Sequence, residues 1–265
     1  MPLSAQASGC IDFVLAPNEI PDELRRLVRE SKNRTRTPRL KKVKAATIEP
    51  LASHGNHLLA ALPVDAQARL LPHLQLTSLP FGKVLYESGD TLRYVYFPVD
   101  SIVSLLYEMD NGESSEFAVV GNEGLIGVSL FMGGESTPSR AVVQSSGRAY
   151  RLLGHRLKTE FNRHSKMMLL LLRYTQALIT QMTQSAACNL HHSLDQRLCR
   201  CLLLRLDCLR PPPRDNKLTM TQAMLASVLG VRRESVTAAA RKLLTLGVIE
   251  YVRGEVVVLD RPKLE

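Results

Sequence analysis

The residues best suited to chemistry lie near the C-terminus, in the run from Thr221 to Arg241. Two short helices are predicted there, because apolar residues recur at helical spacing on both sides of Gly230, which permits a sharp turn. Thr221 can cap the first helix, since its hydroxyl accepts a hydrogen bond from an otherwise unpaired backbone N–H. Gly247 is placed to end the second helix. This layout is typical of a helix-turn-helix, whose second helix enters the DNA major groove.

Polar side chains remain on the outer side of the second helix once its apolar residues are placed in the core. Arg can donate to guanine O6 and N7 and Glu can accept from cytosine N4, and each good bidentate pair contributes ~1–3 kcal/mol of base discrimination. Beyond Gly247 the sequence predicts a β-hairpin, or wing, that can touch phosphate. The candidate DNA-contacting residues are Thr221, Gln222, Arg232, Arg233, Glu234, Thr237, Arg241 and Arg253. The alternative is that the arginines only solvate a three-helix bundle.

A long helix is predicted from about Phe161 to Asn189, where the sequence has neither Pro nor Gly. One stripe on this helix alternates in steps of three and four, the spacing of a coiled-coil seam. The stripe comprises Met168, Leu171, Thr175, Leu178, Met182, Ser185, Asn189 and His192. Because both faces of the helix are apolar, we expect the stripe to be buried against a second copy of the chain. The alternative is a core helix under its own sheet, contacted through Leu169, Leu170 and Leu172.

Short segments rich in β-branched and aromatic residues alternate with turn residues in the first half of the chain. The expected strands span 76–79, 83–86, 94–97, 102–107, 117–120, 141–144 and 149–153. Their spacing predicts an antiparallel sandwich or barrel. The Asn111-Gly112 pair is the best candidate for a tight hairpin turn, because such turns need positive φ. A short helix over 58–71, broken near Pro63, is expected to precede the strands.

Composition limits the class of protein. The chain has 265 residues, 45% hydrophobic and 22% charged, which suits a buried core in two small domains. The longest apolar run, Met167 to Leu172, is far shorter than the ~20 residues that cross a bilayer, and no signal peptide is recognisable. We therefore expect a cytoplasmic protein without a membrane partner.

The net charge of +9 comes from one segment. Between Leu24 and Lys44 there are ten Lys or Arg residues and one Glu. Because the remainder is nearly neutral, net charge alone does not predict that the folded part binds nucleic acid. The extension over 1–50 is interpreted as a flexible basic arm that either binds phosphate without sequence preference or is a solvated tail.

The cysteines indicate neither a disulfide framework nor a metal site. They are odd in number and four lie in one predicted helical stretch: Cys10, Cys188, Cys199, Cys201 and Cys208. Cys188 shares a helix face with His191 and His192, which could hold a soft metal or a redox centre, but core packing of the thiols is favoured. Because no hydrolase elbow or phosphate-cradling Gly loop is present, the chain is not expected to be an enzyme.

From about Leu58 to the C-terminus, the chain resembles the Crp/Fnr family of bacterial transcription regulators. The most specific similarity is Gly230-Val231-Arg232-Arg233-Glu234-Ser235-Val236-Thr237, which is similar to the family's turn and recognition helix. The resemblance implies an α+β fold: an N-terminal jelly-roll-like β domain, a long dimerisation helix and a C-terminal winged helix-turn-helix. It also implies that Arg233 and Glu234 read a G·C pair. Ala238 replaces a second basic base-reader of the family's prototype, so the operator is expected to differ.

The resemblance also locates a candidate effector pocket at Gly127, Val128, Ser139 and Arg140. Family members that bind cyclic nucleotides hold the ribose hydroxyl with a Glu, and Val128 stands at that position. They neutralise the cyclic phosphate with an Arg followed by Ser or Thr; the resemblance gives this role to Arg140, although Ala141 after it lacks the hydroxyl. Without the Glu acceptor a buried hydroxyl is left unpaired, which costs ~1–3 kcal/mol. We therefore do not expect cyclic AMP to bind, while another small effector, or none, stays open. Only Cys10 lies where iron–sulfur members have a Cys cluster, so no such cofactor is expected.

Together these patterns predict a homodimeric regulator that reads near-palindromic double-stranded DNA, with RNA polymerase as a further partner. The expected domains are the basic extension over 1–50, a cyclic-nucleotide-binding-like β-roll sensor over 51–160, a dimerisation helix over 161–192 and the winged helix-turn-helix over 193–265. The alternative is a ligand-binding or protein-interaction module whose helix-turn-helix does not read DNA. An enzyme with a β-roll pocket ranks below both.

Overall fold

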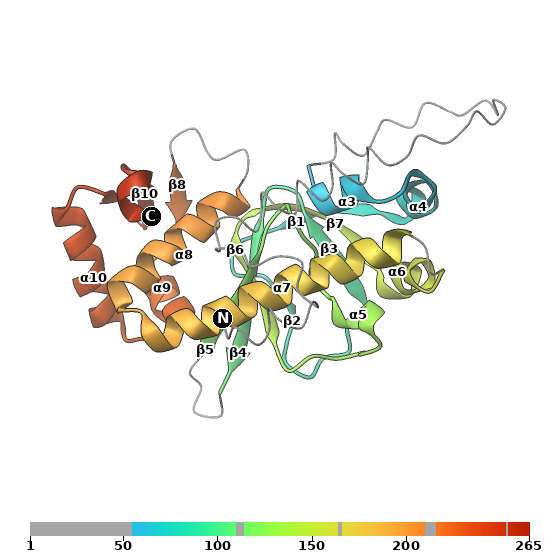
Figure 1. Cartoon of the computed structure of the whole chain (residues 1–265), viewed down its shortest axis with the longest axis horizontal. Helices are drawn as coiled ribbons and strands as arrows, with labels where there is room; N and C mark the ends of the chain where they lie inside the picture. Colours follow the sequence, from blue (N-terminus) through green and yellow to red (C-terminus); the bar gives the residue numbers. More distant parts are fainter. Residues whose placement is uncertain (1–54, 110–113, 164–165, 210–215, 253) are drawn as a thin grey trace, which may run out of the picture.

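Two antiparallel β-sheets form the first half of the structure (Figure 1). The structure is a computed structural model, and it describes residues 55–109, 114–163, 166–209, 216–252 and 254–265. The sheet β1-β7-β3 comprises Gln75–Leu79, Gly147–Leu153 and Tyr94–Pro98. The sheet β2-β6-β4-β5 comprises Val84–Tyr86, Arg140–Ser145, Ile102–Glu108 and Ser114–Val120. The predicted strands are thus confirmed, with small shifts at their ends.

The two sheets share one hydrophobic core. Leu79 and Tyr96 from the first sheet pack in the same cluster as Val103, Ala118 and Ala141 from the second. Residues 102–106 of β4 are buried in succession, because Val103 and Leu105 face this core while Ile102 packs on the other side against Leu204. β4 and β5 are antiparallel neighbours. The predicted Asn111-Gly112 turn between them lies outside the described residues, as do the basic extension over 1–50 and Cys10.

Short helices surround one end of the sandwich. α3 (His57–Ala61) and α4 (Val64–Leu70) flank Pro63, which confirms the predicted break, and the short helix η2 (Leu71–His73) follows. Two further helices, α5 (Ser129–Met132) and α6 (Gly154–Phe161), were not predicted as separate elements.

The prediction of one helix starting at Phe161 is wrong at its N-terminal end. α6 ends at Phe161, and the long helix α7 begins only at Lys166 and continues to His191. No Pro or Gly marks this break, so local sequence did not reveal it. Tertiary contacts decide it instead: Phe161 packs against Phe131 of α5, with ring centroids 5.1 Å apart, and anchors the end of α6.

The stripe expected to form a dimer seam on α7 faces the protein's own β-sandwich. Leu171 packs in one core cluster with Val95 and Phe97, and Leu178 packs in another with strand residues. Thr175 and Ser185 are buried on the same side, whereas Asn189 and His192 near the end of the stripe are exposed. The expected burial of this stripe against a second copy is therefore wrong, and α7 packs under its own sandwich as the alternative stated. Of the three residues that the alternative named, Leu170 packs against the core, whereas Leu169 and Leu172 are exposed.

The C-terminal unit follows α7. It contains α8 (Leu194–Cys208), α9 (Gln222–Leu229), α10 (Arg233–Thr245) and α11 (Arg261–Leu264). A small antiparallel sheet of order β8-β10-β9 completes it, built from Lys217–Thr219, Glu255–Val258 and Ile249–Val252. In Figure 1, α7 crosses the β-sandwich and leads to this unit at the far end of the molecule. Within the described ranges, no helix combines the length and apolar character needed to traverse a lipid bilayer.

Candidate DNA-binding interface and effector cavity

The helix-turn-helix has the local geometry that the sequence predicts. The Thr221 hydroxyl accepts a hydrogen bond from the Met224 N–H at 3.2 Å and caps α9. Gly230 ends this helix with φ +61°, a left-handed conformation in which a Cβ is strained. Leu225 and Val236 are buried in a common core, so α9 holds α10 at a fixed position.

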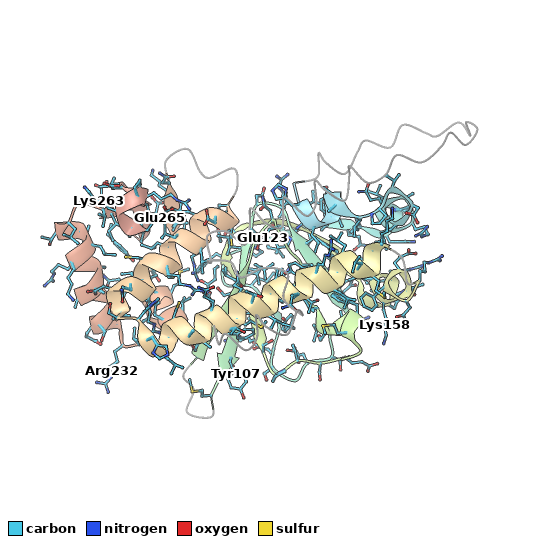
Figure 2. The ribbon with its side chains drawn as sticks, viewed as in Figure 1. Tyr107, Glu123, Lys158, Arg232, Lys263 and Glu265 are labelled. Atoms are coloured by element: carbon cyan, nitrogen blue, oxygen red, sulfur yellow. The ribbon has the colours of Figure 1, made fainter. Side chains whose placement is uncertain are left out.

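The polar residues at the start of α10 face solvent. Arg232 precedes the helix, and Arg233 and Glu234 form its first turn; all three side chains are exposed, as is Arg241 further along. Figure 2 shows Arg232 projecting away from the body of the protein. Side chains in this position can reach base edges in a major groove without first breaking contacts in a core.

Two other candidate residues connect the helices to each other. The Thr237 hydroxyl lies 3.0 Å from the Arg233 carbonyl oxygen and 3.1 Å from the Gln222 Oε1. Both Gln222 and Thr237 are half-buried. These contacts indicate that the pair fixes the angle between α9 and α10 while remaining at the edge of the exposed surface. Thr221 likewise has its hydroxyl engaged as the cap.

The wing is present, and it has one strand more than predicted. β9 and β10 form the expected antiparallel pair, and β8 adds to the free side of β10. The Tyr251 hydroxyl donates to the Met220 carbonyl oxygen at 2.7 Å, which attaches the wing to the start of the helix-turn-helix. Arg253 lies outside the described residues, so its phosphate contact stays a prediction from the sequence.

A cavity of about 320 Å³ opens in the β-sandwich beside α7. Three of the four expected pocket residues, Gly127, Val128 and Ser139, line it. Arg140 is not among the lining residues: its side chain pairs with Glu87 at 2.8 Å and with Glu108 at 3.2 Å. The guanidinium that the resemblance assigns to a ligand phosphate thus already has two carboxylate partners, which the sequence alone did not reveal.

The cavity wall is apolar with a few hydroxyl groups. Among the described residues that line it, none carries a formal charge: Tyr86, Leu105, Tyr107, Phe117, Leu125, Gly127, Val128, Ser129, Thr137, Pro138, Ser139, Leu178 and Met182. Burial raises the pKa of Tyr86, while a hydrogen bond with Ser139 opposes this rise. Leu178 and Met182 belong to α7, so an occupant would touch both the sandwich and the long helix.

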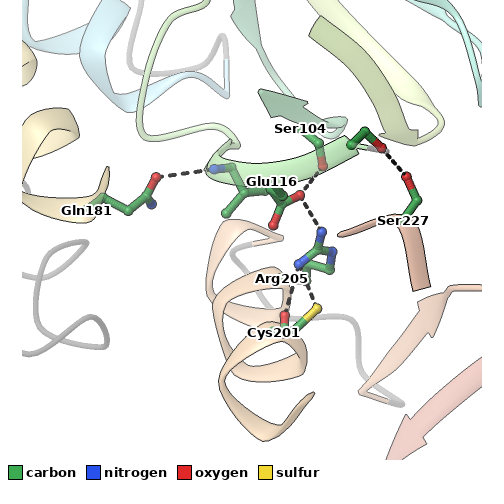
Figure 3. A network of polar contacts seen from close by, with 8 residues as sticks. Ser104, Glu116, Gln181, Cys201, Arg205 and Ser227 are labelled. Atoms are coloured by element: carbon green, nitrogen blue, oxygen red, sulfur yellow. Dashed lines mark hydrogen bonds and ion pairs between the residues drawn. The ribbon is translucent and has the colours of Figure 1, made fainter. Parts of the chain in front are cut away.

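Sequence reasoning missed a buried polar network between the sandwich and the C-terminal unit (Figure 3). Arg205 of α8, only 2% exposed, donates to the Glu116 carboxylate of β5 at 2.6 Å. The same guanidinium contacts the Cys201 carbonyl oxygen at 3.2 Å and its sulfur at 3.0 Å, and Ser104 donates to Glu116. An i, i+4 spacing of Cys201 and Arg205 was visible in the sequence, but nothing there indicated the partner on β5.

Two further contacts connect the same surfaces. The Ser114 and Ser227 hydroxyls lie 2.8 Å apart, which joins β5 to α9, and the Gln181 Oε1 of α7 accepts from the Val119 N–H at 3.2 Å. A small apolar cluster of Ile102, Val119, Leu204 and Cys208 lies beside them. The position of the helix-turn-helix is therefore set by contacts with the strand that also borders the cavity.

The thiols lie mainly in the protein core. Cys188, Cys201 and Cys208 are buried and Cys199 is partly buried, and burial raises the pKa of Cys201 to about 11. Across the described ranges, no group of three or more His, Cys, Asp or Glu side chains is arranged to hold a metal ion. This geometry is typical of thiols that pack as small apolar groups.

A β-sandwich followed by a long helix and a winged helix-turn-helix defines a class of DNA-binding proteins. Comparisons with known protein families identify the same two domains. Residues 76–164 match the cyclic nucleotide-binding domain, and residues 196–265 match the Crp-like helix-turn-helix domain. The chain belongs to the Crp/Fnr family of DNA-binding transcription regulators, a family of regulators and not of enzymes.

Solved structures show the same fold. FixK2 from Bradyrhizobium japonicum is 17% identical with a TM-score of 0.61, over 72% of this chain and 95% of that chain. The c-di-GMP responsive global regulator CLP from Xanthomonas campestris is 17% identical with a TM-score of 0.61, over 75% and 100%. A CRP/FNR-family transcriptional regulator from Thermus thermophilus is 22% identical with a TM-score of 0.57, over 72% and 96%. No curated protein matches the chain significantly.

Proposed function

We propose that this regulator binds a near-palindromic operator as a homodimer and reads its bases with the start of α10. The observation that supports this most is the exposure of Arg232, Arg233 and Glu234 on a helix whose inner face is fixed in a core. Two such helices, held about one turn of duplex apart, match two half-sites. Thr221, Gln222, Thr237, Arg241 and Arg253 complete the proposed contact surface.

Selection from randomised duplex DNA followed by gel-shift titration tests this function. The expected result is one enriched inverted-repeat sequence, bound at least ~10³-fold more tightly than random duplex at physiological salt. Recovery of random sequences with uniform affinity would instead support the alternative, a ligand-binding or interaction module whose helix-turn-helix does not read DNA. RNA polymerase is a further proposed partner, and the cytoplasm is the expected compartment for a DNA-binding regulator.

The outer face of α7 supports the homodimer. Its residues recur in steps of three and four, and all are exposed in the isolated chain: Leu169, Leu172, Gln176, Ile179, Thr183, Ala186 and Leu190. This is the spacing of a coiled-coil seam, one face away from the stripe expected from the sequence. Because Leu190 is 80% exposed and Leu169 and Ile179 are about half exposed, burial against a second copy removes substantial apolar surface from water.

Replacing Ile179 by Glu should dissociate the dimer. A carboxylate in a desolvated seam costs several kcal/mol, so the dimer dissociation constant should rise ~10²-fold or more. Light scattering across a concentration series measures this change. Leu76→Glu is the matched control, because Leu76 on β1 is also about half exposed but lies away from α7. Equal dissociation by both substitutions, or by neither, would contradict the proposed seam.

We further propose that the cavity beside α7 takes an uncharged, largely apolar effector and not a cyclic nucleotide. The wall offers hydroxyl groups from Tyr86 and Ser139 but no charge, and Arg140 is held by two glutamates. A phosphate placed there would lose water without gaining a cationic partner. Because Leu178 and Met182 of α7 lie in the cavity wall, a bound effector can change the position of α7 and, with it, the orientation of the two C-terminal units in the dimer.

Cyclic AMP should therefore leave the protein's melting temperature unchanged. Calorimetry with cyclic AMP should give no saturable heat, and Arg140→Ala should not alter this result. Val128→Glu is the informative comparison, since it restores the ribose acceptor but not the phosphate partner, and it too should fail to bind. Saturable binding of cyclic AMP to the unaltered chain that Arg140→Ala abolishes would show that Arg140 leaves its glutamates for the ligand.

A further inference from the structure

A second, much smaller cavity lies where the sandwich, α7 and the C-terminal unit meet. Its volume is about 30 Å³. Side chains from four elements line it, including Glu116 of β5, Ser185 of α7, Arg197 and Arg200 of α8, and Leu229 of α9. It is separate from the effector cavity, with which it shares no lining residue.

The two lining arginines are incompletely paired. Arg197 donates through one terminal nitrogen to the Leu229 carbonyl oxygen, and Arg200 donates to the Ser185 hydroxyl at 3.0 Å. The Nε atoms of both side chains are buried and have no hydrogen-bond partner. The Nε of Arg205, on the same helix, is also buried without a partner. Buried polar groups of this kind are normally satisfied by protein, water or an ion.

The charges at this junction do not balance. Among the described residues lining the cavity, Glu116 is the one carboxylate, and it is already paired with Arg205 at 2.6 Å. Arg197 and Arg200 therefore lack a carboxylate partner in this wall. Burial lowers the pKa of both side chains, but a guanidinium stays protonated in proteins and cannot relieve the imbalance by losing a proton. Both side chains are half-buried and their Nε atoms are shielded from solvent, so the uncompensated positive charge favours an anion at this position.

We propose that this cavity binds a small inorganic anion, such as chloride or nitrate, between Arg197 and Arg200. A single water molecule occupies a cavity of roughly 10–15 Å³, so this cavity admits an anion of one or a few heavy atoms and excludes a nucleotide. Neutral water would satisfy the two donors but not the charge. Because Arg197 also holds the Leu229 carbonyl at the end of α9, the anion stabilises the docking of the helix-turn-helix on the sandwich.

Chloride-35 NMR of the full chain, without DNA, tests the site. The buffer anion is gluconate, which is too large for the cavity, and ionic strength is held constant. The protein should broaden the chloride line in a saturable way, and nitrate should reverse the broadening by competition. Because DNA is absent, failure of this experiment leaves the proposed DNA reading untouched, and success does not depend on it.

Three variants, each checked for folding by circular dichroism, locate the site. Arg200→Gln should weaken chloride binding ~10-fold or more, because a charge-assisted hydrogen bond is lost. Arg200→Lys should retain most of the affinity, since it keeps the charge. Arg156→Gln, which changes an exposed arginine on α6, should have no effect. If Arg200→Gln does not fold, Arg197→Gln replaces it.

The proposal is overturned if chloride broadening is absent or does not saturate in the unaltered chain. It is also overturned if Arg200→Gln binds chloride as well as the unaltered chain does, or if Arg200→Lys loses as much affinity as Arg200→Gln while remaining folded. The last result would mean that the shape of the side chain, and not its charge, determines binding.

Discussion

Replacing Arg233 by Ala should remove the preference for one base pair in each half-site of the operator. Arg233 is the first residue of α10, is exposed, and sits on a helix fixed by the buried Val236. Loss of one bidentate contact costs ~1–3 kcal/mol, so two half-sites together lose ~30-fold or more in operator affinity. Gel-shift titration on the selected operator, and on operators changed at each position, measures the effect.

Comparing the affinity lost on the operator with the affinity lost on random duplex distinguishes base reading from sequence-independent attraction to the phosphates. Arg233→Ala should leave affinity for random duplex nearly unchanged, whereas Arg253→Ala in the wing should weaken all duplexes alike, because phosphate contacts are independent of sequence. Arg156→Ala on α6, far along the chain from α10, serves as the control for lost charge. Equal losses on operator and random duplex for Arg233→Ala would refute its assignment as a base reader.

Replacing Glu116 by Leu should destabilise the protein by ~3–5 kcal/mol, because it leaves the guanidinium of Arg205 buried without its carboxylate. The Arg205 side chain is only 2% exposed, so the charge left behind is largely shielded from water. Urea unfolding, followed by far-ultraviolet circular dichroism, measures the change in free energy of unfolding. The exposed pair of Lys242 and Asp195 provides the control: Lys242→Met should change stability by ~0–1 kcal/mol.

The double variant Glu116→Leu with Arg205→Met should recover most of the lost stability. A buried ion pair replaced by well-packed apolar side chains is often neutral in stability, since both desolvation costs vanish together. The difference between the double variant and the sum of the single variants gives the coupling energy. If the double variant is as unstable as the sum of the single variants, Glu116 and Arg205 contribute independently and the buried pair is not the unit that joins the two parts.

The helix-turn-helix could be predicted well because its signals are local. The cap at Thr221, the left-handed turn at Gly230 and the buried Leu225 follow from backbone geometry and short-range spacing. The strands followed for the same reason, since turn residues delimit short β-branched segments. Burial of Val228 and Val236 then left Arg232, Arg233 and Glu234 on the outer surface, as the helical period requires.

The cavity could be only partly predicted. Similarity to the family located Gly127, Val128 and Ser139 at the cavity wall. It gave Arg140 a role that the structure assigns to ion pairs with Glu87 and Glu108 instead. Both glutamates lie more than thirty residues from Arg140 along the chain, so only strand pairing brings them close. The apolar contribution of Leu178 and Met182 was equally invisible before α7 was placed.

The sequence alone determined the strands of the sandwich, the two helices of the helix-turn-helix and the chemistry presented by the start of α10, because propensity, turns and helical period act over a few residues. Tertiary structure decided which apolar face of α7 the sandwich covers, why α6 ends at Phe161, and which carboxylate meets Arg205. Apolar residues recur at helical spacing on both faces of α7, so the periodicity alone does not tell which face is buried. Contacts with segments distant in sequence, through their shape and charge, select the buried face of α7, the end of α6 and the carboxylate that pairs with Arg205.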